Sequence, residues 1–110
     1  MRCFLLCLLT VLVPLKVISG TFDTDEYNAN WGLGSIKAWE AYTKGYTGAG
    51  VTIVIVDTGI ATDHSEFTGK YKFGYDYVNN TSTSSDPHGH GSHVAGIAAA
   101  MRDGVGIHGV

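Results

Sequence analysis

One aspartate and three histidines are the residues whose types and spacing could do chemistry. Asp57 directly follows the apolar run 51–56, and His88, His90 and His93 lie together in a glycine-rich segment further along the chain. Imidazole titrates near neutral pH, so it can act as a base or bind a metal. A carboxylate can orient an imidazole, or share a proton with a second carboxylate. These residue types therefore allow base catalysis, metal-assisted hydrolysis or acid-protease chemistry.

The tripeptide Asp57-Thr58-Gly59 matches the Asp-Thr-Gly of aspartic proteases, where two such loops bring together two carboxylates that share one proton. The chain has one copy, so this interpretation needs a homodimer, and it gives the histidines no role. A structural role, in which Asp57 caps a turn through its own side chain, fits the tripeptide equally well when it is taken alone.

The order His88-x-His90-x-Ser92-His93 has the spacing of a metal site. It is similar to the His-x-His-x-Asp-His of metallo-β-lactamase-type hydrolases, but Ser92 is a poor substitute for the carboxylate ligand. A zinc hydrolase therefore stays open as an alternative. Three histidines on a solvated loop would explain neither the interleaved glycines nor the small-residue segment that follows.

The elements around these residues predict an α/β fold. The run 51–56 is β-branched with almost no polar alternation, which is typical of a strand buried on both faces of a parallel sheet. Asp57 would then lie at the carboxyl end of that strand, where open α/β sheets place their functional residues.

Other segments predict the remaining elements. Ser35 is expected to cap a helix that begins at Ile36 and stops at Gly45. Alternating aromatic residues over 71–78 predict a second strand. The remaining predictions are an interior helix of small residues over 94–101 and the start of a further strand in 104–110.

Composition sets the broad class. The chain has 110 residues, enough for one small domain, with 45% hydrophobic and 15% charged residues. Lys and Arg total 7 against 10 Asp and Glu, which argues against a nucleic-acid partner. We therefore expect a folded core and no backbone-driven binding to DNA or RNA.

Residues 1–19 are predicted to be a signal peptide, with a positive start, an apolar run and then small residues. The apolar run is shorter than the ~20 residues of a spanning helix, so no stable membrane span is expected. Both cysteines, Cys3 and Cys7, fall in this segment, so no disulfide is expected in an exported chain. Residues 20–30 are expected to be an exposed acidic lead-in, and the protein to be secreted or in the cell envelope.

Two segments taken together resemble the subtilisin-like serine proteases. They are Ile-Val-Asp-Thr-Gly-Ile at 55–60 and His-Gly-Ser-His-Val-Ala-Gly at 90–96, and the resemblance runs from about Trp31 to the last residue. It looks closest to the bacterial autotransporter branch. The resemblance implies that residues 31–110 are the amino-terminal part of a three-layer α/β domain with a mainly parallel sheet.

The same resemblance implies roles for single residues. Asp57 would orient the catalytic imidazole and His90 would be the general base, while His93 would be a packing residue of the helix. Gly89 and Gly91 would be required because other side chains there would crowd the substrate or the facing strand. The substrate would be a peptide or protein, and no cofactor or metal is predicted.

The chain also departs from the family pattern. The family's nucleophile lies in a Gly-Thr-Ser-Met-Ala-like block, and its oxyanion-hole Asn precedes that block; neither is found here. Serines outside the signal lack that context: Ser35, Ser65, Ser82, Ser84, Ser85 and Ser92. We therefore expect a fragment that is inactive alone, and the alternative is a secreted non-catalytic remnant or binding module. Ser92 stands where the family usually has Thr, which keeps the hydroxyl.

Asp63 and Glu66 stand where some relatives bind calcium. Two carboxylates fall short of the 6 to 8 oxygens that Ca²⁺ takes, so surface solvation is the favoured interpretation.

Overall fold

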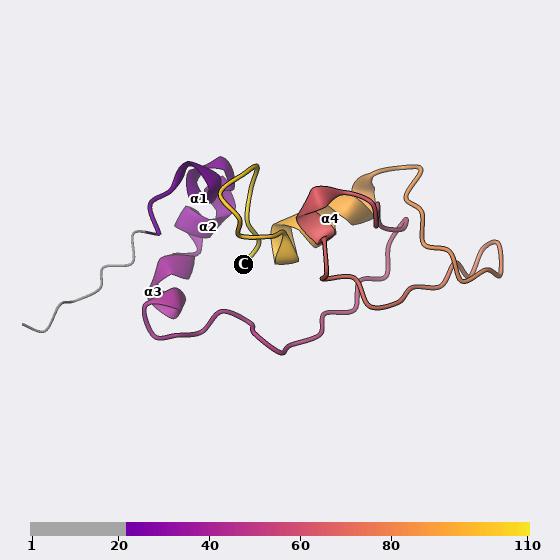
Figure 1. Cartoon of the computed structure of the whole chain (residues 1–110), viewed down its shortest axis with the longest axis horizontal. Helices are drawn as coiled ribbons and strands as arrows, with labels where there is room; N and C mark the ends of the chain where they lie inside the picture. The colour runs from indigo at the N-terminus through magenta and orange to yellow at the C-terminus, as the bar shows by residue number, and fades with distance from the viewer. Residues whose placement is uncertain (1–21) are drawn as a thin grey trace, which may run out of the picture.

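The computed structural model describes residues 22–110, so the predicted signal peptide at 1–19 lies outside the described residues. Four α-helices and one 3₁₀-helix follow in chain order: α1 Asp25–Ala29, α2 Trp31–Ser35, α3 Ala38–Tyr42, η1 Ser65–Phe67 and α4 His90–Ala99. Short connections join α1, α2 and α3, whereas long segments lead from α3 to η1 and from η1 to α4 (Figure 1).

The first helix begins at a side-chain cap. Thr24 Oγ1 accepts a hydrogen bond from the Tyr27 N–H at 3.1 Å, and Asp25 and Glu26 place negative charge in the first turn, where the helix dipole favours it. Glu26, Tyr27 and Asn30 are buried. The prediction of an exposed lead-in over 20–30 is therefore wrong for these three residues, because the helix turns one face into a small core.

That core is formed where α1, α2 and α3 meet. Tyr27, Leu33 and Ala38 form one buried cluster, with Phe22 and Tyr42 packed against it. Leu33 has no exposed surface at all. The apolar contacts of this cluster hold three helices that are each too short to be stable in isolation.

The predicted helix at 36–45 exists but starts later. Lys37 adopts a left-handed conformation with φ 55°, and α3 begins at Ala38. Ser35 does not cap α3, because it belongs to α2 and its hydroxyl donates to the Trp31 carbonyl at 3.4 Å. The helix also ends earlier than the predicted stop at Gly45, at Tyr42. Gly45 follows in the turn after the helix with φ 85°, which glycine adopts without steric cost.

The three predicted strands are absent from the part of the chain that the structure describes. Within 22–110 the only ladder-type pairing is a single antiparallel bridge between Asp76 and Thr81. The expectation that 51–56 is buried on both faces is also wrong here, since Val54 and Val56 are 77% and 94% exposed. A strand needs a neighbour for its backbone N–H and C=O groups, and residues 22–110 place none beside this run.

The predicted small-residue helix is confirmed as α4, although it begins at His90 and not at 94. Gly89 precedes it in a left-handed conformation with φ 86°. Gly91, Ala95 and Gly96 form its buried face. No helix within residues 22–110 is long and apolar enough to cross a membrane.

The two ends of the described chain pack against each other, as Figure 1 shows for α1–α3 and the C-terminal segment. Asn30 Nδ2 donates to the His108 carbonyl at 3.1 Å, and the Tyr42 hydroxyl donates to the Val110 carbonyl at 3.2 Å. The Val110 N–H in turn donates to the Ile97 carbonyl of α4 at 3.1 Å. The C-terminal segment therefore joins the N-terminal helices to α4.

Replacing Leu33 by Ala should destabilise the helical cluster. The lost burial and the cavity left behind are expected to lower the free energy of unfolding by about 2 to 3 kcal/mol. Urea denaturation of the chain, followed by tyrosine and tryptophan fluorescence, measures this change. Ile36→Ala is the matched control, because Ile36 is 61% exposed and its loss should change the free energy by no more than about 0.5 kcal/mol. Equal effects of the two substitutions would contradict the assignment of Leu33 to a core.

Candidate active site

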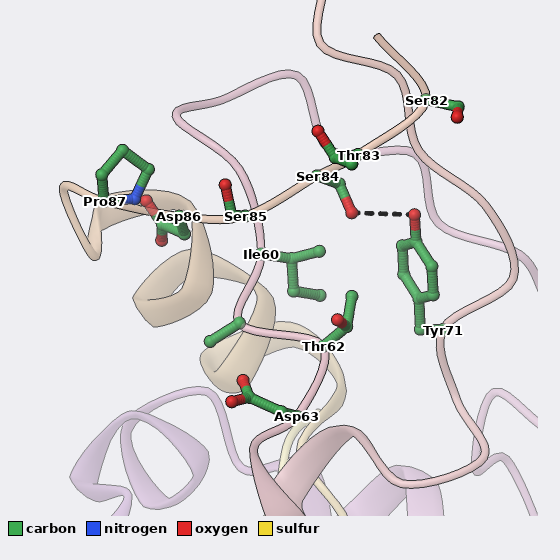
Figure 2. Close-up of a pocket in the computed structure, with 11 residues that line it drawn as sticks. Ile60, Thr62, Asp63, Tyr71, Ser82, Thr83, Ser84, Ser85, Asp86 and Pro87 are labelled. Atoms are coloured by element: carbon green, nitrogen blue, oxygen red, sulfur yellow. Dashed lines mark hydrogen bonds between the residues drawn. The ribbon is translucent and has the colours of Figure 1, made fainter.

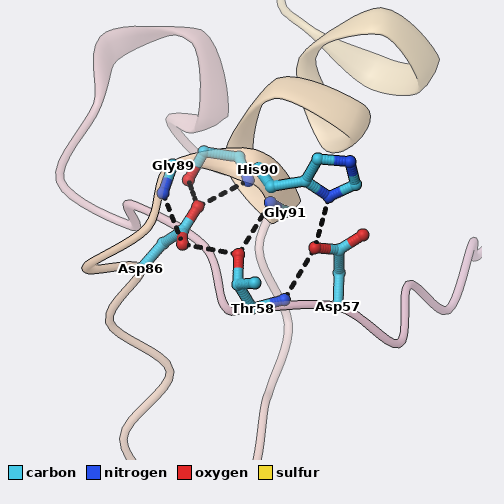
Figure 3. Close-up of polar contacts among 7 residues, drawn as sticks. Asp57, Thr58, Asp86, Gly89, His90 and Gly91 are labelled. Atoms are coloured by element: carbon cyan, nitrogen blue, oxygen red, sulfur yellow. Dashed lines mark hydrogen bonds and ion pairs between the residues drawn. The ribbon is translucent and has the colours of Figure 1, made fainter.

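Asp57 and His90 meet although they are 33 residues apart in sequence. His90 Nδ1 lies 2.7 Å from Asp57 Oδ1. His90 is the first residue of α4, and Asp57 directly follows the apolar run, so the pair joins a helix N-terminus to the segment 57–61 (Figure 3). The structure therefore brings together both residues that the resemblance singled out.

The contact selects one state of the imidazole ring. A carboxylate only accepts hydrogen bonds, so Nδ1 carries a proton, and in the neutral ring Nε2 then has the lone pair. The Nε2 atom makes no hydrogen bond within residues 22–110. The His90 side chain is 58% exposed and that of Asp57 only 16% exposed, so a shielded carboxylate holds an imidazole whose other edge is open. This arrangement can take a proton from a group placed beside Nε2.

Hydrogen bonds stabilise the ionised form of Asp57. The bond from His90 is the main reason that the pKa of Asp57 is lowered, and the Thr58 N–H, which donates to Asp57 Oδ1 at 2.7 Å, lowers it further. Asp57 is therefore a carboxylate at neutral pH, as its partnership with the ring requires.

Two glycines allow the segments to approach. A Cβ at Gly91 would collide with the carbonyl oxygen of Gly59 and would lie 3.2 Å from Asp57 Cβ. Gly59 itself has φ 135°, and a side chain there would strike the backbone of Ser85. The crowding predicted at Gly91 is therefore backbone crowding. At Gly89 the requirement is conformational instead, because its φ is 86° and the space beside it is open.

The sequence interpretation missed Asp86. Its Oδ1 accepts from the Thr58 hydroxyl and the Gly89 N–H, both at 2.8 Å, and its Oδ2 accepts from the Ser92 N–H at 2.8 Å and the Ser92 hydroxyl at 2.7 Å. These bonds, chiefly that from the Ser92 hydroxyl, lower the pKa of Asp86 far below the usual aspartate range. An Asp shortly before a helix start is a capping signal that could have found it.

The other histidines do not join the pair. The rings of His88 and His90 have centroids 6.3 Å apart, and His93 lies on α4 with an exposed side chain. His93 belongs to the helix as expected, but its exposure makes the expectation of a packing residue wrong within residues 22–110. Among residues 22–110 no three His, Cys, Asp or Glu side chains are grouped so that they could hold a metal ion, so the geometry gives the zinc alternative no support.

Asp63 and Glu66 differ from each other. Asp63 is exposed, in line with surface solvation. Glu66 is half-buried, and its Oε1 accepts from the Ile107 N–H at 3.4 Å while Oε2 is buried without a partner. Surface solvation is therefore wrong for Glu66, which faces the backbone of the C-terminal segment.

A cavity of about 600 Å³ is lined by residues 60–63, Tyr71 and residues 82–87, and Asp86 is one of its lining residues (Figure 2). Its walls carry many hydroxyl groups, and the Ser84 hydroxyl donates to the Tyr71 hydroxyl at 2.8 Å. No serine in the described part of the chain hydrogen bonds to His90. The cavity therefore brings serines near Asp86 without presenting one to the imidazole.

Comparison with known families shows which family the chain belongs to. The subtilase family, Peptidase S8, matches residues 48–110, which is more than half of the chain and includes both Asp57 and His90. The chain belongs to the subtilase family.

Several bacterial proteases are similar to this chain. An extracellular serine protease of Serratia marcescens is 49% identical over 98 residues, covering 82% of the chain and 9% of the relative. Alkaline serine exoprotease A of Vibrio alginolyticus is 40% identical, covering 76% of the chain and 16% of the relative. Subtilisin BL of Lederbergia lenta is 38% identical, covering 73% of the chain and 29% of the relative. The chain thus spans less than a third of the length of these subtilases.

Gly91→Ala should separate the two segments of this subtilase site. The added methyl group has to displace the Gly59 carbonyl, which we expect to cost about 1 to 3 kcal/mol and to break the contact between Asp57 and His90. The measurement is the His90 Nδ1–H resonance in the NMR spectrum, which should be lost. Gly34→Ala is the control, since a Cβ there meets nothing within 4 Å. An unchanged resonance in Gly91→Ala would contradict the role given to the glycine.

Removing the imidazole should raise the pKa of Asp57. In His90→Ala the main cause of the lowered pKa is gone, so the pKa should move toward the ordinary value of about 3.9, with some lowering left by the Thr58 N–H. Because the folded-state pKa is lowered, the stability due to this contact is present above about pH 3.9 and is lost as the pH falls through the folded pKa. Titration of the carboxyl carbon by ¹³C NMR measures it. The pKa of Asp86 is the internal control and should stay low.

Proposed function

We propose that the chain is the amino-terminal part of the peptidase domain of a serine endopeptidase, and that Asp57 and His90 are two members of its Ser-His-Asp triad. The observation that carries the proposal is the 2.7 Å contact between Asp57 Oδ1 and His90 Nδ1, with Nε2 left free. Membership of the subtilase family supports the same assignment.

The chemistry follows from the geometry. A serine hydroxyl is a weak nucleophile until a base takes its proton, and His90 Nε2 has the lone pair and the open edge for that step. As the serine oxygen attacks a peptide carbonyl, the proton moves to Nε2, and the Asp57 carboxylate stabilises the imidazolium that forms. His90 then gives the proton to the leaving amine, and water releases the acyl group by the reverse sequence.

The nucleophile is proposed to lie in a part of the protein beyond these 110 residues. None of the serines has the context of the family's nucleophile block, and the chain covers only a fraction of each relative. The 110 residues alone are therefore proposed to be inactive, because loss of one triad member costs several powers of ten in rate.

The partial coverage of the relatives also explains the exposed apolar run. We propose that the apolar run 51–56 becomes a strand of a mainly parallel sheet when the remaining domain pairs with it. Its exposure supports this, since Ile53, Val54 and Val56 are 55%, 77% and 94% exposed and a folded domain rarely leaves such a run in water.

Secretion is proposed on two grounds. Relatives such as that of Serratia marcescens are named extracellular, and residues 1–19 have the pattern of a signal peptide. The placement in the autotransporter branch stays a prediction.

The test expresses the reading frame that continues past Val110 and measures hydrolysis of a peptide substrate and labelling by a fluorophosphonate probe. Asp57→Asn is expected to lower kcat about 10⁴-fold, because the ring loses the partner that holds its tautomer. His93→Gln is the control, because His93 is exposed on the same helix and makes no hydrogen bond or ion pair with Asp57 or His90 within residues 22–110.

The alternatives predict other results. A zinc hydrolase centred on the three histidines would lose activity in His93→Gln and on treatment with a chelator. A non-catalytic remnant would show neither hydrolysis nor probe labelling in the longer product. Either result would overturn the assignment of a serine endopeptidase.

A further inference from the structure

We propose that Asp86 is a positioning residue of the active site, which holds Asp57 and His90 in register by joining the backbone segment of one to the helix of the other. This inference rests on the proposed function, because it assigns Asp86 a role in the same triad. The hydrogen bonds of Asp86 go to Thr58, Gly89 and Ser92 and not to Asp57 or His90, so it would act through the residues between them.

The carboxylate faces both segments at once. Oδ1 accepts from the hydroxyl of Thr58, the residue directly after Asp57, and from the Gly89 N–H directly before His90. Oδ2 accepts twice from Ser92, through its N–H and its hydroxyl. Figure 3 shows Asp86 on the opposite side of the Thr58–Gly91 contact from the Asp57–His90 pair. One side chain therefore spans the junction that the pair depends on.

Two hydroxyl groups link the segment 57–61 and α4 in both directions. Thr58 Oγ1 accepts from the Gly91 N–H of α4 at 3.0 Å, and Ser92 Oγ accepts from the Ala61 N–H at 2.9 Å. Each hydroxyl has thus received a hydrogen bond from the opposite segment, and each directs its own proton to Asp86. The side chains of Thr58 and Ser92 therefore link the two segments, and both hydroxyls donate to the Asp86 carboxylate.

The polarity of this site requires a carboxylate at Asp86. Its four partners are all donors: two backbone N–H groups and two hydroxyl protons. An amide has one acceptor oxygen and an NH₂ group, which would face donors on one side of the junction. Asp86→Asn should therefore break the link to either Thr58 or Ser92 while keeping nearly the same shape.

The position of Asp86 also serves α4. The residue before the helix, Gly89, has no side chain with which to cap it, and Asp86 supplies the acceptor for the Gly89 and Ser92 N–H groups. His90 lies between these two donors in the chain. The direction in which α4 begins, and so the direction of the His90 ring, is set by the same carboxylate that holds Thr58.

The experiment records the His90 Nδ1–H resonance and the ring tautomer by ¹⁵N NMR in the 110-residue chain and its variants. Asp86→Asn is expected to lose the Nδ1–H resonance and to mix the two tautomers, while helicity by circular dichroism and slow amide exchange in the last turn of α4 are retained. Asp63→Asn is the matched control. It removes the same charge from the rim of the same cavity, and Asp63 makes no hydrogen bond or ion pair within 22–110, so its spectrum should be that of the unsubstituted chain.

A second variant decides the case if Asp86→Asn unfolds α4. Thr58→Val has nearly the shape of threonine and removes only the hydroxyl that joins Asp86 to Gly91. It should weaken the Nδ1–H resonance with α4 intact. In the longer protein, Asp86→Asn should lower kcat by about 10²-fold with KM little changed, because misplacement of a catalytic group affects the chemical step.

The outcomes separate this inference from the function on which it rests. An Nδ1–H resonance that survives in folded Asp86→Asn, or that keeps its full intensity in Thr58→Val when the first variant unfolds, overturns the positioning role and leaves the triad assignment standing. Absence of the resonance from the unsubstituted chain overturns both. Loss in Asp86→Asn together with retention in Asp63→Asn supports the positioning role.

Discussion

The site depends on the close approach of two backbone segments that are far apart in the sequence. Asp57 can reach His90 only because Gly91 lets the first turn of α4 lie directly on the segment 57–61, while Gly59 lets that segment lie against the backbone of Ser85. A side chain at either glycine would meet backbone atoms, which cannot rotate away as a side chain can. The hydrogen bond that defines the chemistry is therefore a consequence of where two residues have no Cβ.

Polar contacts then fix what the glycines allow. Close approach by itself leaves the two segments free to slide, since backbone surfaces without side chains offer little shape to interlock. The hydroxyls of Thr58 and Ser92 remove that freedom by accepting from the opposite segment and donating to Asp86. The network needs every member, because each lone pair and each proton has a defined partner. Ser92 in place of the family's usual Thr keeps the one group that the network uses.

The helical ends of the chain support this junction from a distance. Leu33 and its neighbours hold α1, α2 and α3 together, and the C-terminal segment connects them to α4 through backbone carbonyls. The middle of the chain, in contrast, leaves its apolar residues in water. Residues 22–110 thus bury the helical part of the fold, which carries His90. They leave exposed the apolar run that leads into Asp57.

The sequence by itself determined the local chemistry: a carboxylate after an apolar run, an imidazole at the start of a small-residue helix, and glycines where the two had to come close. The small-residue helix could be predicted from residue types and short spacings, whereas the pairing of Asp57 with His90 was predicted only through the family resemblance. The sequence interpretation failed for the strands, because a strand is stabilised by neighbours that lie elsewhere in the chain, and for α1 and Glu66, because burial depends on what packs over a residue. Asp86 shows the same limit, since an Asp before a helix looks like any cap until Thr58 is seen on its other side. Only the tertiary structure decided that one carboxylate serves both segments, because hydrogen bonds between residues distant in sequence have no local signature.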